Sequence, residues 1–243
     1  MYIQDYFGFM IALLVCMGFS LIASRKVNTT FAKYDQVRSR RGVTGYETVR
    51  RLMQRNGVRG ISIGKVSGNL TDHYHPKHAV VNLSDATYNS ASVAAIAVAA
   101  HEMGHVMQKQ EGYGFYRLRT AMVPVVNIGT FLAMPLVLIG VLLDSMVQTV
   151  DPELGFKLAM LGVILYGGSM AFALVTLPVE LDASNRARRM LLEEGILTED
   201  EIPGARKVLS AAAMTYLASL LTSVVYFLRF AFYVLTMFGR RDD

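Results

Sequence analysis

The segment AAIAVAAHEMGHVMQ places two histidines and a glutamate within five residues. His101 and His105 are four positions apart, and Glu102 directly follows the first histidine. Residues four apart lie on one helical face, so both imidazoles can reach one ion at Zn–N distances of about 2.0 to 2.1 Å. Glu102 would then accept a proton from a water in the open coordination position and pass it to a departing amine. The spacing predicts a zinc peptidase site, with a chance pair of helical histidines as the alternative.

A catalytic zinc site needs a third protein ligand, because one position is kept for water. The best candidate is Glu180, which follows an apolar stretch in PVELDASNRA. A carboxylate at the end of a membrane helix is costly unless a cation offsets it. Asp182 is the competing ligand, and on a helix it turns away from Glu180, so only one of them should face the ion. A carboxylate paired with Arg186 or Arg188 is the structural alternative for Glu180.

The histidines must be held by regular elements around them. We expect a helix over 90–110, with Asn89 or Ser90 as its cap and Gly112 just after its end. The segment 44–56 reads as an amphipathic helix, because its apolar residues recur at helical spacing and Asn-Gly follows them. The alternation at 61–63 and the segment 79–83 predict strands, with a turn at 66–69 between them.

The composition indicates a membrane protein rather than a soluble enzyme. The chain has 243 residues, of which 53% are hydrophobic, and the apolar residues fall in long blocks. A membrane-spanning helix needs about 20 mostly apolar residues. The stretches that meet or nearly meet this length without any charge are 6–24, 120–143, 158–179 and 208–228.

The basic residues predict how these helices are oriented. Arg25 and Lys26 follow the first stretch, whereas its leader has only Asp5, so we expect a retained anchor rather than a cleaved signal peptide. Most basic residues lie in 25–119 and 180–207, which should face the cytoplasm, and the acidic connector 144–157 should lie outside.

One basic residue bears on the number of membrane spans, and the net charge bears on whether the chain binds nucleic acid. Arg229 interrupts the last apolar stretch, so that a re-entrant or interfacial helix is an alternative to a fourth span. The net charge of +5 is explained by positive-inside bias and anionic lipid, and no nucleic-acid-binding fold accompanies it. Cys16 is the single cysteine, so no intramolecular disulfide can form.

Several further residues near the motif have alternative interpretations. The histidines of TDHYHPKH could bind a second ion, but a loop that is solvated or that tunes the mouth of the site is favoured, because no carboxylate or cysteine completes a known spacing; they are His73, His75 and His78. Three tyrosines could stabilise an oxyanion or serve as interfacial anchors, namely Tyr88, Tyr113 and Tyr116. The strand at 79–83 is either an open edge that pairs with a peptide substrate or an internal strand.

The combination of motifs resembles the YugP-like neutral zinc metallopeptidases of bacterial membranes, which are similar in pattern to the HtpX and CAAX prenyl protease group. The resemblance rests on TDHYHPKHAVVNLSDATYN, AAHEMGHVMQ and VELDASNRA, and covers about 42–187. It implies that His101, His105 and Glu180 bind zinc and that Glu102 is the base. In the prenyl protease group an Asp follows the Ala of the third motif, but here Ser184 stands there. Support for a histidine must come from Ser184, Asp182 or elsewhere.

Together these observations predict a mainly α protein with three or four membrane helices and a small α+β, zincin-like metallopeptidase domain. The expected parts are an anchor (1–24), a cytoplasmic zinc-peptidase domain (25–119), a transmembrane hairpin (120–179), a cytoplasmic segment with the third ligand (180–207) and a transmembrane or re-entrant helix (208–243). We expect a zinc metalloendopeptidase of the bacterial cytoplasmic membrane, with its site on the cytoplasmic side and peptides or membrane proteins as substrates.

Two other classes of protein compete with this prediction. One is a non-enzymatic membrane scaffold with a structural metal site, which would usually show four protein ligands. The presence of Glu102, which a structural site does not need, favours catalysis. The other class is a transporter, which is disfavoured because the spans lack several ionisable groups to mark a pathway.

Overall fold

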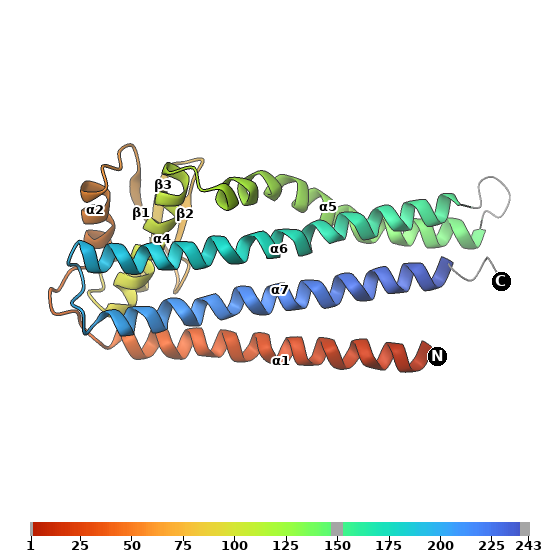
Figure 1. Cartoon of the computed structure of the whole chain (residues 1–243), viewed down its shortest axis with the longest axis horizontal. Helices are drawn as coiled ribbons and strands as arrows, with labels where there is room; N and C mark the ends of the chain where they lie inside the picture. The colour runs from red at the N-terminus through yellow and green to blue at the C-terminus, as the bar shows by residue number, and fades with distance from the viewer. Residues whose placement is uncertain (1, 147–152, 239–243) are drawn as a thin grey trace. The chain divides into compact units, whose positions relative to one another are not determined.

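The computed structural model describes residues 2–146 and 153–238 and is mainly helical, as predicted, with one small sheet (Figure 1). The elements, in chain order, are α1 (Tyr2–Asp35), α2 (Gly45–Arg55), β1 (Ser62–Val66), β2 (His73–His75), β3 (Val80–Ser84), α3 (Asp85–Tyr88), α4 (Val93–Gln110), α5 (Gly114–Met146), α6 (Leu154–Glu193) and α7 (Ile202–Phe238).

The chain divides into two compact units, and long helices contribute to both. The bundle unit comprises Met1–Ser20, Leu118–Leu177 and Tyr216–Asp243, and the mixed unit comprises Leu21–Arg117 and Pro178–Thr215. Helix α6 continues without a break from the apolar stretch through Glu180 to Glu193. Glu180 therefore lies on a helix whose earlier turns belong to the bundle unit.

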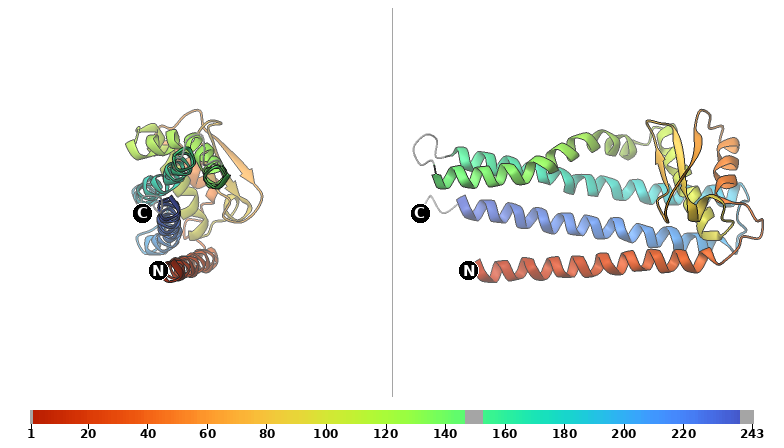
Figure 2. Two further views of the ribbon diagram at one scale, coloured as in Figure 1. Left: turned by 90° about the vertical axis from the view of Figure 1, so that its right-hand side faces the viewer. Right: turned by 180° about the vertical axis from the view of Figure 1, so that it is seen from behind.

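The bundle unit consists of long helices (Figure 2), and many large apolar side chains of these helices are exposed. Four helices of the described chain, α1, α5, α6 and α7, are long and apolar enough to cross a membrane. Helices α5 and α6 approach closely, because a Cβ added to Gly140 would lie 2.5 Å from the backbone oxygen of Gly155. Small residues at such a crossing are typical of helix packing in lipid. The prediction of three or four spans is consistent with this arrangement, and α7 is one of the candidates.

The sheet of the mixed unit has the strand order β1-β3-β2. Strand β3 pairs in parallel with β1, with Ile63 opposite Val81, and antiparallel with β2, with Tyr74 opposite Val81. The strand predicted at 79–83 therefore exists, displaced by one residue, but it lies in the centre of the sheet. Of the two alternatives for this strand, the internal strand is confirmed and the open edge is not, because both sides of β3 pair with other strands. The open edges belong to β1 and β2.

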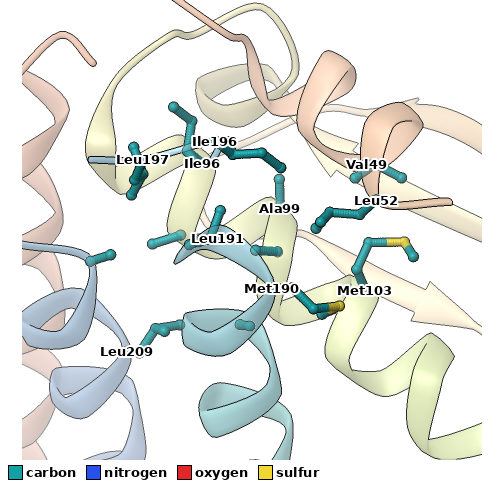
Figure 3. Packing of buried hydrophobic residues seen from close by; sticks show 14 of the residues in the cluster. Val49, Leu52, Ile96, Ala99, Met103, Met190, Leu191, Ile196, Leu197 and Leu209 are labelled. Atoms are coloured by element: carbon teal, nitrogen blue, oxygen red, sulfur yellow. The ribbon is translucent and has the colours of Figure 1, made fainter. Parts of the chain in front are cut away.

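The core of the mixed unit surrounds α4 (Figure 3). Its alanine-rich face allows neighbouring elements to approach closely, and Ala99 and Met103 are fully buried. Leu52 of α2 packs on one side, and Leu191 of α6 belongs to the same cluster. Burial of a large aliphatic side chain contributes about 1.5 to 3 kcal/mol, so this core fixes the position of α4 in the unit.

The element boundaries follow local capping chemistry. The amphipathic helix predicted over 44–56 is α2, which begins after Thr44, and Thr44 forms a capping box with Glu47. Helix α4 begins at Val93, with Ser92 as the cap that accepts from the Ala95 N–H, so the predicted start at residue 90 was wrong. The short α3 ends at Tyr88, the residues from Asn89 to Ser92 are not helical, and the Ser92 hydroxyl oxygen is the one that caps α4. The predicted end at residue 110 is confirmed.

Candidate metal centre

Three of the predicted site residues come together in the mixed unit. His101 and His105 project from successive turns of α4, and Glu180 comes from α6. The Oε2 atom of Glu180 lies 3.2 Å from His101 Nε2 and 3.4 Å from His105 Nε2. Glu180 and His105 are buried, with 3% and 8% of their surfaces exposed. The residues that the structure describes contain one such group of His, Cys, Asp and Glu ligands, and it is this one.

The three ligand atoms lie within 4.8 Å of one another, and the two histidine-to-glutamate separations fit a tetrahedral zinc ion. Two ligands that each lie about 2.0 to 2.1 Å from the ion at the tetrahedral angle are separated by about 3.3 to 3.4 Å. The two histidine-to-glutamate distances, 3.2 and 3.4 Å, agree with this separation. Two imidazoles and one carboxylate are also a donor set that suits zinc. The cluster can therefore hold a metal ion with little rearrangement.

Gln108 fixes the orientation of the His105 ring. Its Nε2 atom donates to the backbone oxygen of Val179 at 2.7 Å and to Asp182 Oδ2 at 2.9 Å. Both partners can only accept, so the remaining amide oxygen must face His105 Nδ1, which lies 2.9 Å away. Nδ1–H is then the donor to Gln108, and Nε2 is the ring atom that faces Glu180, where it can bind a metal ion or carry a proton that it donates to the carboxylate. A side chain that is fully buried on α4 thus selects the tautomer that a metal requires.

Ser184 performs the corresponding task for His101. Its Oγ atom lies 3.2 Å from His101 Nδ1. When Nδ1 carries the proton and donates to this oxygen, Nε2 is again the free atom that faces Glu180. The residue that stands in place of the acidic one in the prenyl protease pattern therefore contacts a histidine directly. Asp182 acts on His105 indirectly, because it accepts a hydrogen bond from Gln108, and it also accepts one of 2.6 Å from Arg186 Nε.

Gly104 allows α4 and α6 to approach closely enough for the cluster to form. A Cβ added at this position would lie 2.4 Å from the backbone oxygen of Ala183 and 3.0 Å from its Cα. Ala183 is itself fully buried. Any side chain at position 104 would push the two helices apart, and Glu180 is one turn from the contact. The glycine within the HEMGH motif is therefore explained by packing.

The carboxylate of Glu102 is hydrogen-bonded to strand β2, whereas the two histidines face Glu180. Its Oε2 atom accepts a hydrogen bond of 2.8 Å from the backbone N–H of Tyr74, in β2. The side chain is buried, with 7% of its surface exposed. Because the N–H of Tyr74 is directed to Glu102, that N–H lies on the side of β2 away from β3. The carboxylate is thus anchored at the open edge of the sheet.

The electrostatic balance of the cluster favours positive charge. Burial of the imidazole lowers the pKa of His105, but the hydrogen bond and the negative charge of Glu180, together with the charge of Glu102, outweigh it and raise the pKa above its ordinary value. The site therefore stabilises a cation at the position of the His105 ring nitrogen. A divalent ion supplies that charge and competes with the proton for the same nitrogen.

The remaining candidate residues do not join the cluster. Asp182 lies with Gln108 and Arg186, and the ring of Tyr113 packs under the Arg186 guanidinium at 5.8 Å. The ring of Tyr88 packs on that of Tyr46 in α2, with their centroids 5.1 Å apart. The Tyr116 ring lies beside the site, with its centroid 6.3 Å from that of His105.

The histidines of TDHYHPKH lie partly in a strand rather than in a loop, but His73 and His78 are exposed to solvent, and in the described residues none of the three joins a group of metal ligands. His73 and His75 lie in β2, and His78 lies in the turn before β3. His73 Nε2 lies 3.0 Å from Asn82 Nδ2, and the rings of His75 and His78 pack together with centroids 4.3 Å apart. The segment forms a strand because cross-strand pairing with β3 overrides its low strand propensity.

The comparisons with known proteins agree with this geometry. Residues 9–235 match the family model described as "Putative neutral zinc metallopeptidase". The chain belongs to this family. It is also 42% identical over 235 residues to "Putative membrane protease YugP" of Bacillus subtilis (strain 168), a match that covers 97% of this chain and 99% of that protein. No solved structure matches the chain. Together with the four apolar helices, the similarity to a membrane protease indicates a multi-pass membrane protein.

The resemblance to zinc metallopeptidases that the sequence suggested is therefore confirmed at the level of the family. Sequence reasoning missed three positions that shape this family member's site: Gly104, Gln108 and Tyr74. Gln108 could have been found, because a residue three positions after His105 lies on the same face of the helix. Gly104 and Tyr74 act through contacts with α6 and β2, and no spacing within the motif reveals those contacts.

Proposed function

We propose that this family member is a membrane-embedded zinc metalloendopeptidase in which His101, His105 and Glu180 bind the ion and Glu102 is the general base. The observation that carries the proposal is the orientation of both imidazoles. Each Nδ1 has its own partner, Ser184 or Gln108, and each Nε2 faces the same carboxylate oxygen at the spacing of a tetrahedral site.

The chemistry assigned to the side chains follows from their positions. Zinc, when bound, supplies a Lewis acid that lowers the pKa of a water to about 7 and polarises the scissile carbonyl. Glu102 follows His101 on α4 and lies beside the cluster, where it accepts the proton of the attacking water and delivers it to the departing amine. The Tyr74 N–H holds the carboxylate in place and leaves its second oxygen for the water.

The open edge of β2 gives the peptide a place to bind. An extended peptide can pair with an exposed strand through main-chain hydrogen bonds, so that little sequence is read. The edge that carries Tyr74 is free of other strands in the described sheet and lies at Glu102. Because Glu102 takes the Tyr74 N–H, the Tyr74 carbonyl is the group of this edge that can accept a hydrogen bond from a peptide. A substrate on this edge has its backbone beside the general base. Strand β2 therefore takes the role that the sequence considered for the strand at 79–83.

The location follows from the distribution of basic residues. The segments that hold the site residues, 25–119 and 180–207, are the ones rich in Lys and Arg. The positive-inside bias places them on the cytoplasmic side of a bacterial cytoplasmic membrane. The substrates are then peptides or proteins in or near the bilayer, including membrane proteins.

The competing function is a membrane scaffold with a structural metal site. Structural zinc sites are usually closed by four protein ligands. In the described residues three ligands converge, and the carboxylate of Glu102 is bonded to Tyr74 rather than turned into the cluster. This arrangement leaves a coordination position open, which favours the peptidase.

The test is cleavage of an unfolded model protein by the purified full chain in detergent. Glu102→Gln keeps the shape and the acceptor oxygen of the side chain but cannot take a proton, so we expect normal zinc content and at least a hundredfold loss of cleavage. Glu193→Gln removes an exposed carboxylate at the end of α6 and serves as the matched control. Full activity in Glu102→Gln, or zinc with no cleavage by any form, would contradict the peptidase assignment and favour the scaffold.

A further inference from the structure

A small cavity lies between α6 and α7 in the mixed unit, beside the metal centre. Its volume is about 160 Å³. At roughly 30 Å³ per water molecule, it has room for about five waters, or for a phosphate group with fewer. The polar part of its lining consists of Ser184, Asn185, Arg188, Arg206 and Ser210. No acidic residue lines it, so the cavity is positively charged.

The two arginines of the cavity lack acidic partners. In the parts of the chain that the structure describes, neither Arg188 nor Arg206 takes part in an ion pair. The hydrogen bond of Arg188 goes to Asn185 Oδ1 and is long, at 3.4 Å. Arg186, two residues earlier, is by contrast held by Asp182 and Glu111. The Arg188 and Arg206 guanidinium groups thus remain available for an anion, and a guanidinium matches phosphate oxygens in pairs.

The remaining lining residues point to the source of the anion. Leu181, Leu209 and Ala213 give the cavity an apolar wall. The charge-free stretch of α6 ends at Val179 and that of α7 begins at Val208, so the cavity lies where both helices pass from apolar to charged sequence. At that level of a membrane helix, lipid headgroups meet the protein, and basic pockets between helices bind anionic headgroups.

We propose that this cavity binds the phosphate group of an anionic phospholipid, with Arg188 and Arg206 on the phosphate and the apolar wall against the lipid's glycerol and acyl portions. A free phosphate ion would satisfy the arginines but not the apolar wall. A lipid satisfies both. The cavity is therefore a lipid site of the cytoplasmic leaflet, formed by residues outside the metal cluster.

The lipid site shares one residue with the metal centre. Ser184 lines the cavity, and its Oγ atom also lies 3.2 Å from His101 Nδ1. A lipid in the cavity limits the movement of Ser184 and so supports the orientation of His101. Cleavage should therefore be faster in anionic vesicles than in neutral ones. This consequence rests on the proposed peptidase function, whereas lipid binding does not, so a binding assay separates the two.

The experiment measures binding of short-chain phosphatidylglycerol to the purified full chain in neutral detergent. Arg188→Gln combined with Arg206→Gln removes both cavity arginines. Arg189→Gln combined with Lys207→Gln removes the same charge from the neighbouring exposed positions and is the matched control. We expect saturable binding by the wild type, a rise in Kd of roughly tenfold or more in the cavity variant, and an unchanged Kd in the control. Arg188→Lys with Arg206→Lys should give an intermediate Kd, because charge is kept but the paired contact is lost.

Three results would overturn the proposal. The first is no saturable binding of phosphatidylglycerol by the wild type. The second is an equal loss in the cavity and control variants, since that would mean general attraction to basic charge. The third is competition by inorganic phosphate or by an acidic peptide at the same concentration as the lipid, which would give the arginines a soluble ligand instead. Normal zinc content and a normal circular dichroism spectrum of the cavity variant establish that it is folded.

Discussion

Replacement of Gly104 by Ala tests whether the approach of α4 to α6 forms the metal centre. The new Cβ would lie 2.4 Å from the Ala183 backbone oxygen, whereas ordinary contact begins near 3.4 Å. The oxygen belongs to a helix backbone and cannot rotate away, so the helices must separate by about 1 Å. Metal–ligand distances tolerate about 0.2 Å, so Glu180 would no longer share an ion with His101 and His105. We expect a loss of about 1 to 3 kcal/mol of stability, as for other overpacked cores.

The assay combines zinc titration with thermal unfolding of the metal-free protein. Gly104→Ala should lower the zinc affinity by about a hundredfold, the upper end of the effect of disturbed ligand support. Gly114→Ala is the matched control, because a Cβ at that glycine of the mixed unit meets nothing within 4 Å. If Gly104→Ala binds zinc and unfolds like the wild type, the close approach of α4 to α6 does not determine the site.

The other predictions concern single contacts. Gln108→Leu removes the acceptor for His105 Nδ1 and should weaken zinc binding by about 10- to 100-fold in a competition titration; unchanged affinity would refute the assigned tautomer. Ser184→Ala should weaken it less, because the lost contact is longer at 3.2 Å, and a larger loss than that of Gln108→Leu would reverse this order. Zinc binding should release protons and weaken as the pH falls, because the raised pKa of His105 lets a proton compete with the ion. Calorimetry in two buffers of different ionisation enthalpy measures the number of protons released, and zinc binding without proton release would contradict the prediction. Burial raises the pKa of Glu201, but N–H donors, chiefly that of Thr198, outweigh the effect of burial and lower this pKa. Ionised Glu201 therefore stabilises the fold above its unfolded pKa, and this stabilisation is lost as the pH falls through the lowered pKa. Glu201→Gln should unfold more easily at pH 7, and its free energy of unfolding should decline less in acid than that of the wild type.

The sequence predicted the features that depend on local pattern. The helix that carries His101 and His105, its end at Gln110 and the capped helix α2 follow from spacing and turn residues. The place of Glu180 at the end of an apolar stretch favours it over Asp182 as the third ligand. The structure brings Glu180 to both histidines and turns Asp182 to Gln108.

The features that the sequence did not predict depend on contacts between distant segments. Strand β2 forms because β3 offers it a partner, and the same pairing makes β3 central rather than an edge. The cap of α4 is Ser92 rather than Asn89 or Ser90, because Val93 N donates to Val37 O across the unit and fixes where the helix begins. A single sequence contains no signal for such pairings, which tertiary packing decides.

X-ray absorption at the zinc edge tests the proposed centre most directly. The spectrum of the purified full chain should fit two imidazole nitrogens at about 2.0 to 2.1 Å, one carboxylate oxygen and one exchangeable light atom. Glu180→Ala should lose the carboxylate component together with most of the zinc. A wild-type spectrum with four fixed protein ligands, or one that Glu180→Ala leaves unchanged, would contradict an open site formed by His101, His105 and Glu180.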